Sequence, residues 1–325
     1  AYDAGISEEY GNISISKEFE NIVAKDNKGK TIASGTADLD DSLVIQKAFD
    51  SLNYKDIVCF DNSEYTISKT ITVTNKNLVI QGKDTKFNIN TGSNSPGFTF
   101  KGTNIKSTPF SSNANEGDNK VILADTSGVN AGDLIRIYND ELWCPDQYPT
   151  HKTGEMYIVK SVSENTVTLN SNLIRDYTTA LNSNAIIYRP ITVEIDGCQF
   201  IGKGVEDKVK GISLEYCKDS KISNCYFEDN GQASIYLLTC YGVEVSGNTI
   251  LDSNMAGYGY GVAIVNACSN ITVHDNIIRN CRHTITSGDA SEYGVNREVY
   301  ISNNTLYRDD GKSAVVDAHP STLNY

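Results

Sequence analysis

The sequence predicts an all-β protein: a right-handed single-stranded parallel β-helix with an N-terminal capping helix and a small antiparallel β insertion. Two strand patterns recur together about every 25 residues, a spacing typical of repeat proteins. An amphipathic helical pattern precedes the first repeat, and the repeat is interrupted over residues 104–190. Each coil of such a solenoid contacts only its neighbours, so a chain of 325 residues can grow along one axis without a single compact core.

The first strand pattern alternates apolar and polar residues, as a strand with one buried face requires. It occurs in I-T-V-E-I-D-G-C-Q-F (191–200), S-K-I-S-N-C-Y-F (220–227), V-E-V-S-G-N-T-I (243–250), I-T-V-H-D-N-I-I (271–278) and V-Y-I-S-N-N-T-L (299–306). One aligned position holds Cys198, Cys225, Asn248, Asn276 and Asn304, at separations of 27, 23, 28 and 28 residues. Coils stacked at ~4.8 Å bring like residues together, so the asparagines are expected to form a ladder in which they satisfy one another's amides.

The second strand pattern predicts another wall of the same coils. It reads I-S-L-E-Y-C (212–217), I-Y-L-L-T-C (235–240), A-I-V-N-A-C (263–268), T-I-T-S-G-D (284–289) and A-V-V-D-A-H (314–319). In this alignment one outward column is Glu215, Leu238, Asn266, Ser287 and Asp317. The column two residues further on is Cys217, Cys240, Cys268, Asp289 and His319.

The eight cysteines fit this stacking better than they fit a metal site. Several share columns, which predicts small apolar thiols packed between coils, with an occasional disulfide left open. No C-x-x-C pair or Cys/His pair at ligand spacing occurs, so zinc is not expected. No cofactor is expected; calcium in the Asp- and Asn-rich turns is left open, although no D-x-[DN]-x-[DN]-G loop is present.

The chain divides into four parts. Residues 1–34 are polar and are expected to form an N-terminal arm. Residues 35–103 hold a helix, with Ile45, Ala48, Phe49 and Leu52 on one face, and the first coils. Residues 104–190 form the antiparallel insertion, which includes a hairpin at 163–165, and residues 191–325 form the coils that carry the candidate site.

Charge and hydropathy limit the partners. With 28 Lys+Arg against 41 Asp+Glu the net charge is −13, which argues against nucleic acid and anionic membranes as main partners. No run of ~18 apolar residues predicts a membrane span. The chain begins with Ala1 and not Met, which fits a processed export product or a trimmed sequence equally well. We expect an extracellular, cell-surface or virion location.

Polar residues gather towards the C-terminal coils. Arg282 and His283 lie about one coil from Asp317 and His319, which makes these four residues the candidate catalytic group. The candidate substrate-binding residues are Glu215, Asn266, Asp289, Tyr258, Tyr260, Tyr293 and Trp143. Tyr258 and Tyr260 belong to a Gly-rich loop and could stack on sugars, although turn filler is the simpler reading; Trp143, the single Trp, is more often a packing anchor.

Two stretches carry a family resemblance. G-T-A-D-L-D-D-S-L-V-I-Q-K-A (35–48) resembles the G-x-x-D-D-T-x-A-I-Q-x-A opening of pectate-lyase-like β-helix proteins, which include many phage tailspikes. Asp317-Ala318-His319 is similar to the D-P-H element of mannuronan epimerases and related uronate lyases, with Ala318 in place of proline. The resemblance implies His319 as the proton-abstracting base, Asp317 as its partner and Arg282 as the group that masks the sugar carboxylate. It assigns proton donation to His283 or Tyr293.

The function that follows is binding, and cleavage or modification, of a polysaccharide or cell-surface glycan. Lyase or epimerase chemistry is preferred over hydrolysis. A glycosidase needs two carboxylates ~5 to 9 Å apart, for which Asp289 with Asp317, or Glu215 with Asp252, are the candidates. A non-catalytic adhesin or receptor-binding module and a purely structural spike are the alternatives. The tailspikes that the chain resembles are usually homotrimers.

Overall fold

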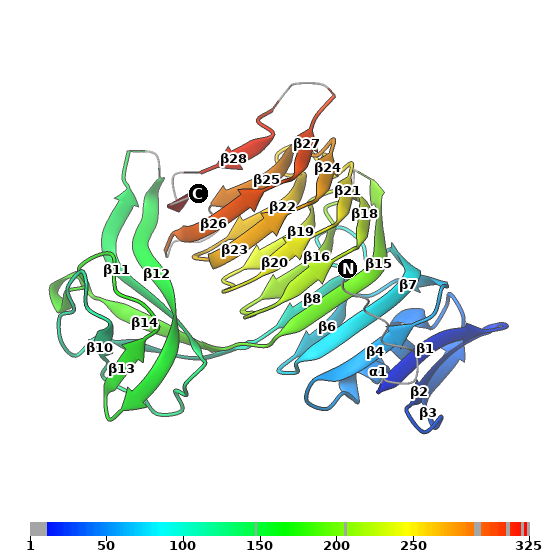
Figure 1. The fold of residues 1–325 in the computed structure, drawn as a ribbon, viewed down its shortest axis with the longest axis horizontal. Helices are drawn as coiled ribbons and strands as arrows, with labels where there is room; N and C mark the ends of the chain where they lie inside the picture. Colours follow the sequence, from blue (N-terminus) through cyan, green and yellow to red (C-terminus); the bar gives the residue numbers. More distant parts are fainter. Residues whose placement is uncertain are drawn as a thin grey trace.

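The computed structural model describes residues 12–146, 148–204, 207–288, 294–309, 313–319 and 322–323. The chain winds into a solenoid of three parallel walls, and a separate antiparallel sheet stands beside it (Figure 1). The predicted right-handed parallel β-helix is confirmed.

The first wall is the main path of the largest sheet. Its parallel strands are β4 (Asp56–Phe60), β7 (Leu78–Ile89), β15 (Val193–Gly204), β17 (Lys221–Ser223), β20 (Glu244–Ser246), β23 (Ser269–His274), β26 (Asn296–Ser302) and β29 (Thr322–Leu323).

The second wall branches from the same sheet because β7 and β15 are long enough to run through both walls. It consists of the second halves of these two strands together with β5 (Glu64–Ile67), β18 (Tyr226–Asn230), β21 (Thr249–Leu251), β24 (Ile277–Arg279) and β27 (Thr305–Tyr307).

The third wall is a separate parallel sheet. Its strands, in order, are β6 (Ile71–Thr74), β8 (Phe98–Lys101), β16 (Lys210–Glu215), β19 (Ala233–Leu238), β22 (Tyr260–Val265), β25 (His283–Gly288) and β28 (Val316–Ala318).

The asparagine ladder is confirmed. The Cys225 amide donates to Asn248 Oδ1 at 2.9 Å, the Asn248 amide to Asn276 Oδ1 at 2.9 Å, and the Asn276 amide to Asn304 Oδ1 at 2.9 Å. Each side chain thus receives the backbone N–H of the preceding coil, and the Nδ2 atoms donate to carbonyls inside the solenoid. Buried amides are therefore paired along the axis, which is the condition for placing polar groups in a core.

The alignment of the second strand pattern was wrong beyond its second segment. Ile212 is in register with Ile235, and then with Val262, Ile285 and Val316. The outward column that ends at Asp317 therefore consists of Ser213, Tyr236, Ala263, Thr286 and Asp317. The turns between the second and third walls differ in length from coil to coil, so a constant spacing does not predict where each third-wall strand begins. The apolar residues inside these strands are similar, so the sequence pattern does not correct the register.

The cysteine columns are confirmed in part. Cys240 donates its backbone N–H to Cys268 Sγ at 3.3 Å, so these two residues stack. The next member is Asn296, whose Oδ1 accepts the Cys268 amide at 2.8 Å, and not Asp289. All eight cysteines lie in the described ranges, and none of them is part of a disulfide there.

The predicted capping helix is α1 (Asp41–Asp50), and its apolar face is buried against the first coils. Ile45, Ala48 and Phe49 are almost fully buried. Polar residues at the helix start bind the first coil: Asp41 accepts the Thr66 amide at 2.7 Å and Ser42 Oγ accepts the Ser68 amide at 2.8 Å. The helix therefore closes the open end of the apolar core.

The expectation of an arm over residues 1–34 needs correction in its described part. β1 (Ile13–Glu18), β2 (Asn21–Asp26) and β3 (Thr31–Thr36) form an antiparallel meander, and β1 pairs in parallel with β4. Short alternating runs such as I-S-I-S bury Ile13 and Ile15. Pairing with β4 protects the edge of the first wall, which would otherwise expose unpaired backbone groups.

The insertion leaves the solenoid after β8 and returns at β15. Its strands are β9 (Thr103–Pro109), β10 (Lys120–Ile122), β11 (Leu134–Cys144), β12 (Tyr148–Ser163), β13 (Thr166–Leu169) and β14 (Asn184–Arg189), with a 3₁₀ turn η2 (Thr179–Leu181). They form an antiparallel sheet with its own apolar core, and β12 and β13 form the predicted hairpin. A Cβ on Gly102 would lie 2.4 Å from the Arg189 carbonyl oxygen, so only glycine fits where the entering and leaving chains cross.

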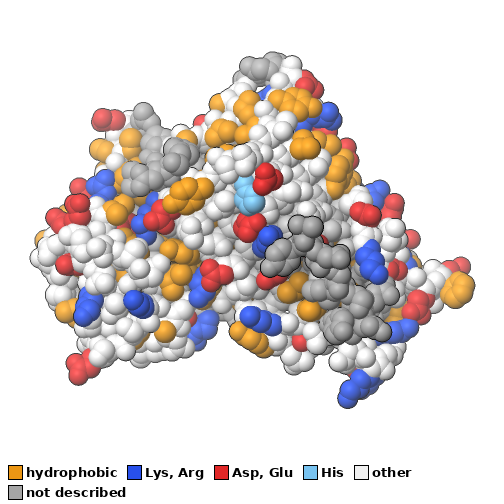
Figure 2. All heavy atoms as spheres, viewed as in Figure 1, with side chains coloured by type: hydrophobic (Ala, Val, Ile, Leu, Met, Phe, Trp, Pro, Cys, Tyr) orange, Lys and Arg blue, Asp and Glu red, His pale blue; other side chains and the backbone are white. Residues whose placement is uncertain are grey.

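The insertion packs on the corner turns between the third and first walls. Tyr188 stacks on Tyr216 with ring centroids 4.3 Å apart, and Asn170 donates to the Tyr241 hydroxyl at 2.8 Å. Arg297 donates to the Met156 carbonyl at 2.9 Å. In the space-filling view the insertion and the solenoid form two lobes with a notch between them (Figure 2). No helix in the described ranges is long and apolar enough to cross a membrane.

Candidate functional site

A groove lies on the outer face of the third wall. One outward column of this wall holds the small buried residues Ser213, Ala263 and Thr286 together with Tyr236. The groove contains a cavity of about 270 Å³ lined by Gln232, Tyr236, Tyr258, Tyr260, Ile264, Val265, Thr286, Gly288 and His319. Three tyrosines and a histidine give an amphipathic pocket of the kind that holds sugars.

Two histidines meet one carboxylate at this cavity. Asp317, on β28, is in register with Thr286, which lines the cavity. His319 Nε2 lies 3.0 Å from Asp317 Oδ2, and His283 Nε2 lies 3.2 Å from the same oxygen. The structure thus places His283, Asp317 and His319 together, on adjacent coils.

The hydrogen bonds define the protonation of His283. Its Nδ1 lies 2.7 Å from the Ala314 carbonyl and must be the donor, because a carbonyl only accepts. Burial lowers the pKa of His283, and Arg282 is among the nearby charges that lower it further. His283 is therefore neutral near pH 7, with its lone pair on Nε2, a buried atom that forms no hydrogen bond and only approaches Asp317.

His319 has the geometry of a base oriented by a carboxylate. To donate to Asp317, its Nε2 must carry hydrogen, so in the neutral form the proton-accepting lone pair is on Nδ1. The side chain is partly exposed and lines the cavity, whereas His283 is buried. The two histidines thus have different environments although they share one carboxylate.

Tyr258 and Tyr260 both line the cavity, but each has one ring face occupied. Tyr260 stacks on His283, in register one coil later, with centroids 6.0 Å apart and planes at 12°. The Lys208 ammonium lies 3.8 Å from the Tyr258 ring centroid. Any sugar that stacks on these rings must use the opposite faces.

Sequence reasoning missed several residues of the groove. Tyr236 is outward in the I-Y-L-L-T-C segment, and its ring carries the Lys210 ammonium at 3.7 Å. A large aromatic at an outward strand position was a signal that could have been used. Lys208, Lys210 and Gln232 carried no such signal, since single polar residues near turns are common.

Glu215 and Asn266 lie outside the histidine cluster. Glu215 ends β16 and forms an ion pair with Lys101 at 2.9 Å. It is four coils from β28, roughly 19 Å at ~4.8 Å per coil. Asn266 occupies the turn after β22 with a φ of 61°, and its carbonyl accepts the Thr239 hydroxyl.

Arg282 and Trp143 do not line the cavity. Arg282 immediately precedes β25, and its carbonyl accepts a hydrogen bond from Arg308. Trp143 belongs to β11 of the insertion, where the Arg175 guanidinium lies 4.3 Å from its ring centroid. Asp289 and Tyr293 lie outside the described residues.

Of the two carboxylate pairs suggested for hydrolysis, Asp289 with Asp317 falls partly outside the described residues, and Glu215 with Asp252 is not brought together. Asp252 lies in the loop before β22, whereas Glu215 ends β16. They therefore occupy opposite ends of six-residue strands, roughly 20 Å apart at ~3.3 Å per residue. That separation is too large for a glycosidase pair.

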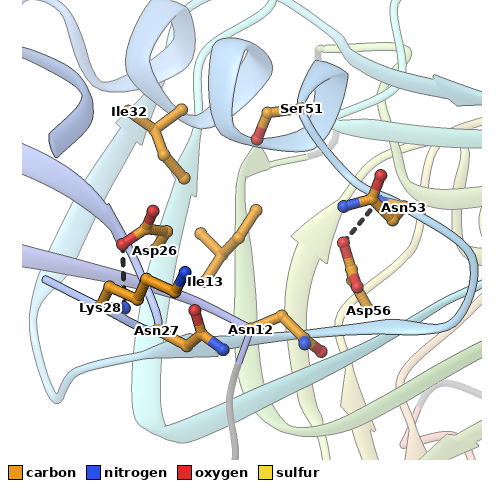
Figure 3. Close-up of a pocket in the computed structure, with 9 residues that line it drawn as sticks. All are labelled: Asn12, Ile13, Asp26, Asn27, Lys28, Ile32, Ser51, Asn53 and Asp56. Atoms are coloured by element: carbon orange, nitrogen blue, oxygen red, sulfur yellow. Dashed lines mark hydrogen bonds between the residues drawn. The ribbon is translucent and has the colours of Figure 1, made fainter. Parts of the chain in front are cut away.

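A second cavity, of about 420 Å³, lies at the N-terminal end between β1, β2 and the segment after α1 (Figure 3). Its polar groups serve the turns around it: Asp26 accepts the amides of Lys28 and Lys30, and Asn12 accepts the Ile57 amide. It contains none of the residues predicted for the site. Across the described parts of the chain, no group of three or more His, Cys, Asp or Glu residues is placed to hold a metal ion.

Comparison with known proteins identifies the fold family. The family described as "Right handed beta helix region" matches residues 158–323, just over half of the chain. The chain belongs to this family. The predicted relation to the pectate-lyase-like superfamily is thereby confirmed. None of the curated proteins matches the sequence of this β-helix protein.

Three solved tailspikes have the same fold. The Gp54 tailspike of Acinetobacter baumannii bacteriophage AP22, solved with A. baumannii capsular saccharide, is 20% identical with a TM-score of 0.70, covering 84% of this chain and 45% of that chain. The tailspike gp49 of Pseudomonas phage LKA1 is 24% identical with a TM-score of 0.72. The match covers 86% of this chain and 47% of gp49. The tailspike gp61 of Pseudomonas phage phi297 is 20% identical with a TM-score of 0.70, covering 83% and 45%. The β-helix chain spans about half the length of these tailspikes.

Proposed function

We propose that the groove on the third wall binds a polysaccharide and that His319, oriented by Asp317, moves a proton in its cleavage or epimerisation. The convergence of His283 and His319 on one Asp317 oxygen, beside a cavity with three tyrosines, carries this proposal. A lone histidine would have a structural explanation, but a partly exposed histidine paired with a carboxylate in a pocket is the usual arrangement of a general base.

The geometry favours a lyase or epimerase over a glycosidase. In β-elimination His319 Nδ1 would take the C5 proton of a uronate, the electron pair would form the C4–C5 double bond, and the C4–O bond would break. An epimerase would use the same first step and return the proton to the other face. Glu215 lies too far from Asp252, and also from Asp317, to complete a glycosidase pair.

The leaving oxygen must receive a proton from a group other than His283, contrary to one reading of the resemblance. Neutral His283 has its single N–H committed to the Ala314 carbonyl, and its Nε2 can only accept. Tyr260 lines the same cavity as His319 and stacks on His283, so its hydroxyl, which lies 3.5 Å from the Gly257 carbonyl, is the donor we propose.

The biological setting belongs to the same proposal. A β-helix with the fold of phage tailspikes, one of which was solved with a capsular saccharide, fits a virion-associated or extracellular protein that recognises a bacterial surface glycan. We further propose a homotrimer. A measurement of mass in solution tests the trimer and leaves the groove proposal untouched.

The test is a depolymerisation screen against alginate, polygalacturonate and bacterial capsular polysaccharides. A lyase produces unsaturated uronate absorbance, a hydrolase produces reducing ends without it, and an epimerase changes only the proton NMR spectrum. We expect His319→Ala to abolish turnover and keep binding, whereas His274→Ala, on the first wall, should change neither. Binding without turnover of any substrate would leave an adhesin, and no binding to any glycan would refute the proposal.

A further inference from the structure

We infer that Lys208 and Lys210 form a cationic subsite that holds a carboxylate of an acidic sugar unit, at a distance from the proton-transferring histidine. This inference rests on the proposed glycan-binding groove and narrows its ligand to a carboxylated polysaccharide. The inference also gives Lys208 and Lys210, which do not contact the histidine cluster, a role in substrate specificity.

The two ammonium groups are held on one side of the cavity. Lys208 Nζ lies 3.8 Å from the ring centroid of Tyr258, and Lys210 Nζ lies 3.7 Å from that of Tyr236. Both tyrosines line the cavity, and both lysine side chains are half-buried. A cation over a ring face is fixed in position by the ring quadrupole, at little cost in hydrogen-bonding capacity.

Among the described residues, neither ammonium group forms an ion pair, in a protein whose net charge is −13. Glu215, at the other end of β16, is paired with Lys101, although its charge also favours the charged form of Lys210. Burial lowers the pKa of Lys210, so its charged form is held at a cost that a bound anion would offset. Two cations without a carboxylate partner among the residues that the structure describes point to an external anion.

The strand position of Lys210 favours a sugar unit other than the reacting one. Lys210 shares its outward column with Ala233, Tyr260 and His283. His283 is three coils away, roughly 14 Å at ~4.8 Å per coil. A carboxylate held at Lys208 and Lys210 therefore belongs to a sugar unit other than the one at His319, on a polymer that runs along the solenoid axis.

The test compares native and carboxyl-reduced forms of each polysaccharide that the wild-type protein binds in the screen of alginate, polygalacturonate and capsular polysaccharides. We expect the Lys208→Gln/Lys210→Gln double variant to lose at least tenfold in affinity for the native polymer and nothing for the reduced polymer. The double Arg variant should retain binding. Lys86→Gln, which removes a partly exposed lysine paired with Glu64, is the matched control and should behave as wild type.

Turnover separates this subsite from the catalytic centre. The double Gln variant should raise KM about tenfold and leave kcat within twofold, as for a contact made equally in ground and transition states. Equal binding of native and carboxyl-reduced polymers, or of dextran sulfate and the carboxylated polymer, would overturn the carboxylate subsite and leave the groove proposal standing. Failure to bind any polysaccharide would overturn both.

Discussion

The first and third walls of the solenoid carry charge on their outer faces in different ways. On the first wall, Glu244 is bonded to Lys221 at 3.1 Å and to His274 at 3.1 Å, and His274 also contacts Asp275 at 2.7 Å. On the third wall, Lys210 faces a tyrosine ring and two histidines share a single carboxylate. The same strand geometry thus pairs the charges of this part of the first wall, whereas the third wall, apart from pairs such as Lys101–Glu215, leaves charges incompletely paired.

The difference shows how a repeat protein can hold a site without changing its fold. Adjacent coils place outward residues ~4.8 Å apart, which is close enough for opposite charges to pair whenever the sequence supplies both signs in one column. In the view of Figure 2, acidic and basic side chains are interspersed over the visible face. An outward column that contains charges of only one sign, or aromatic rings in place of acidic residues, has charged groups that a ligand can still bind.

The largest expected effect concerns the shared carboxylate. Asp317→Asn should lower turnover about 100-fold or more, because an amide cannot hold His319 in the tautomer with hydrogen on Nε2. Glu244→Gln is the matched change on the first wall and should leave turnover unchanged. The measurement is initial rate at saturating polysaccharide, and equal rates for the two variants would remove the distinction between the walls.

The next effect concerns the rings that carry the lysines. Tyr236→Leu and Tyr258→Leu should each weaken polysaccharide binding by about 1 kcal/mol, close to fivefold, through loss of the cation–π contact and of ring area. Tyr300→Leu, which removes an exposed ring from the first wall, is the control. Calorimetric titration distinguishes the three variants, and an equal loss in all of them would argue for non-specific stacking.

The two walls should also differ in pH dependence. Burial lowers the pKa of His283, so as pH falls below the usual value of 6.5 the unfolded chain binds a proton that the folded chain does not, and stability decreases. Asp275 raises the pKa of His274, so its stabilising contribution is present below 6.5 and is lost as pH rises through its higher folded value. Urea unfolding across pH 5 to 8 should show a flatter acid side for His283→Asn and a flatter alkaline side for His274→Asn. Unchanged pH profiles would contradict these assignments.

The smallest effect concerns the paired charges themselves. Lys221→Gln should change the free energy of unfolding by at most about 1 kcal/mol, because both members of the Lys221–Glu244 pair are partly exposed and solvent screens them. A larger loss in urea unfolding would mean that the first-wall charges act as a cooperative network.

The sequence predicts the solenoid well because its core pattern is redundant. The column from Cys198 to Asn304 is correct, since each asparagine marks a turn and cannot be shifted without burying an unpaired amide. The third-wall register fails after Ile235, because Ala263, Thr284 and Ala314 are small or β-branched residues that fit either face. His283, Asp317 and His319 still meet, because a shift of one or two residues in register does not move a residue to another coil.

The remaining features of the groove depend on contacts that no local pattern encodes. Lys208 and Lys210 form cation–π contacts with tyrosines of the following coils. Tyr258 reaches Lys208 only because the loop before β22 is long enough. The strands β1 to β3 were missed for a related reason: their alternation is short, and only the free edge of β4 makes it a sheet.

The insertion bears on how the solenoid opens. Coils that contact only their neighbours can fray one by one from an end. Here the turns at Tyr216, Tyr241 and Ala267 pack against one sheet of the insertion, and the Gly294 amide donates to the Lys152 carbonyl. Opening any of these coils also breaks that shared contact, so β16, β19, β22 and β25 should exchange their amide hydrogens as one cooperative unit, more slowly than β1 to β3. A groove built across several coils thereby keeps its spacing during local fluctuations.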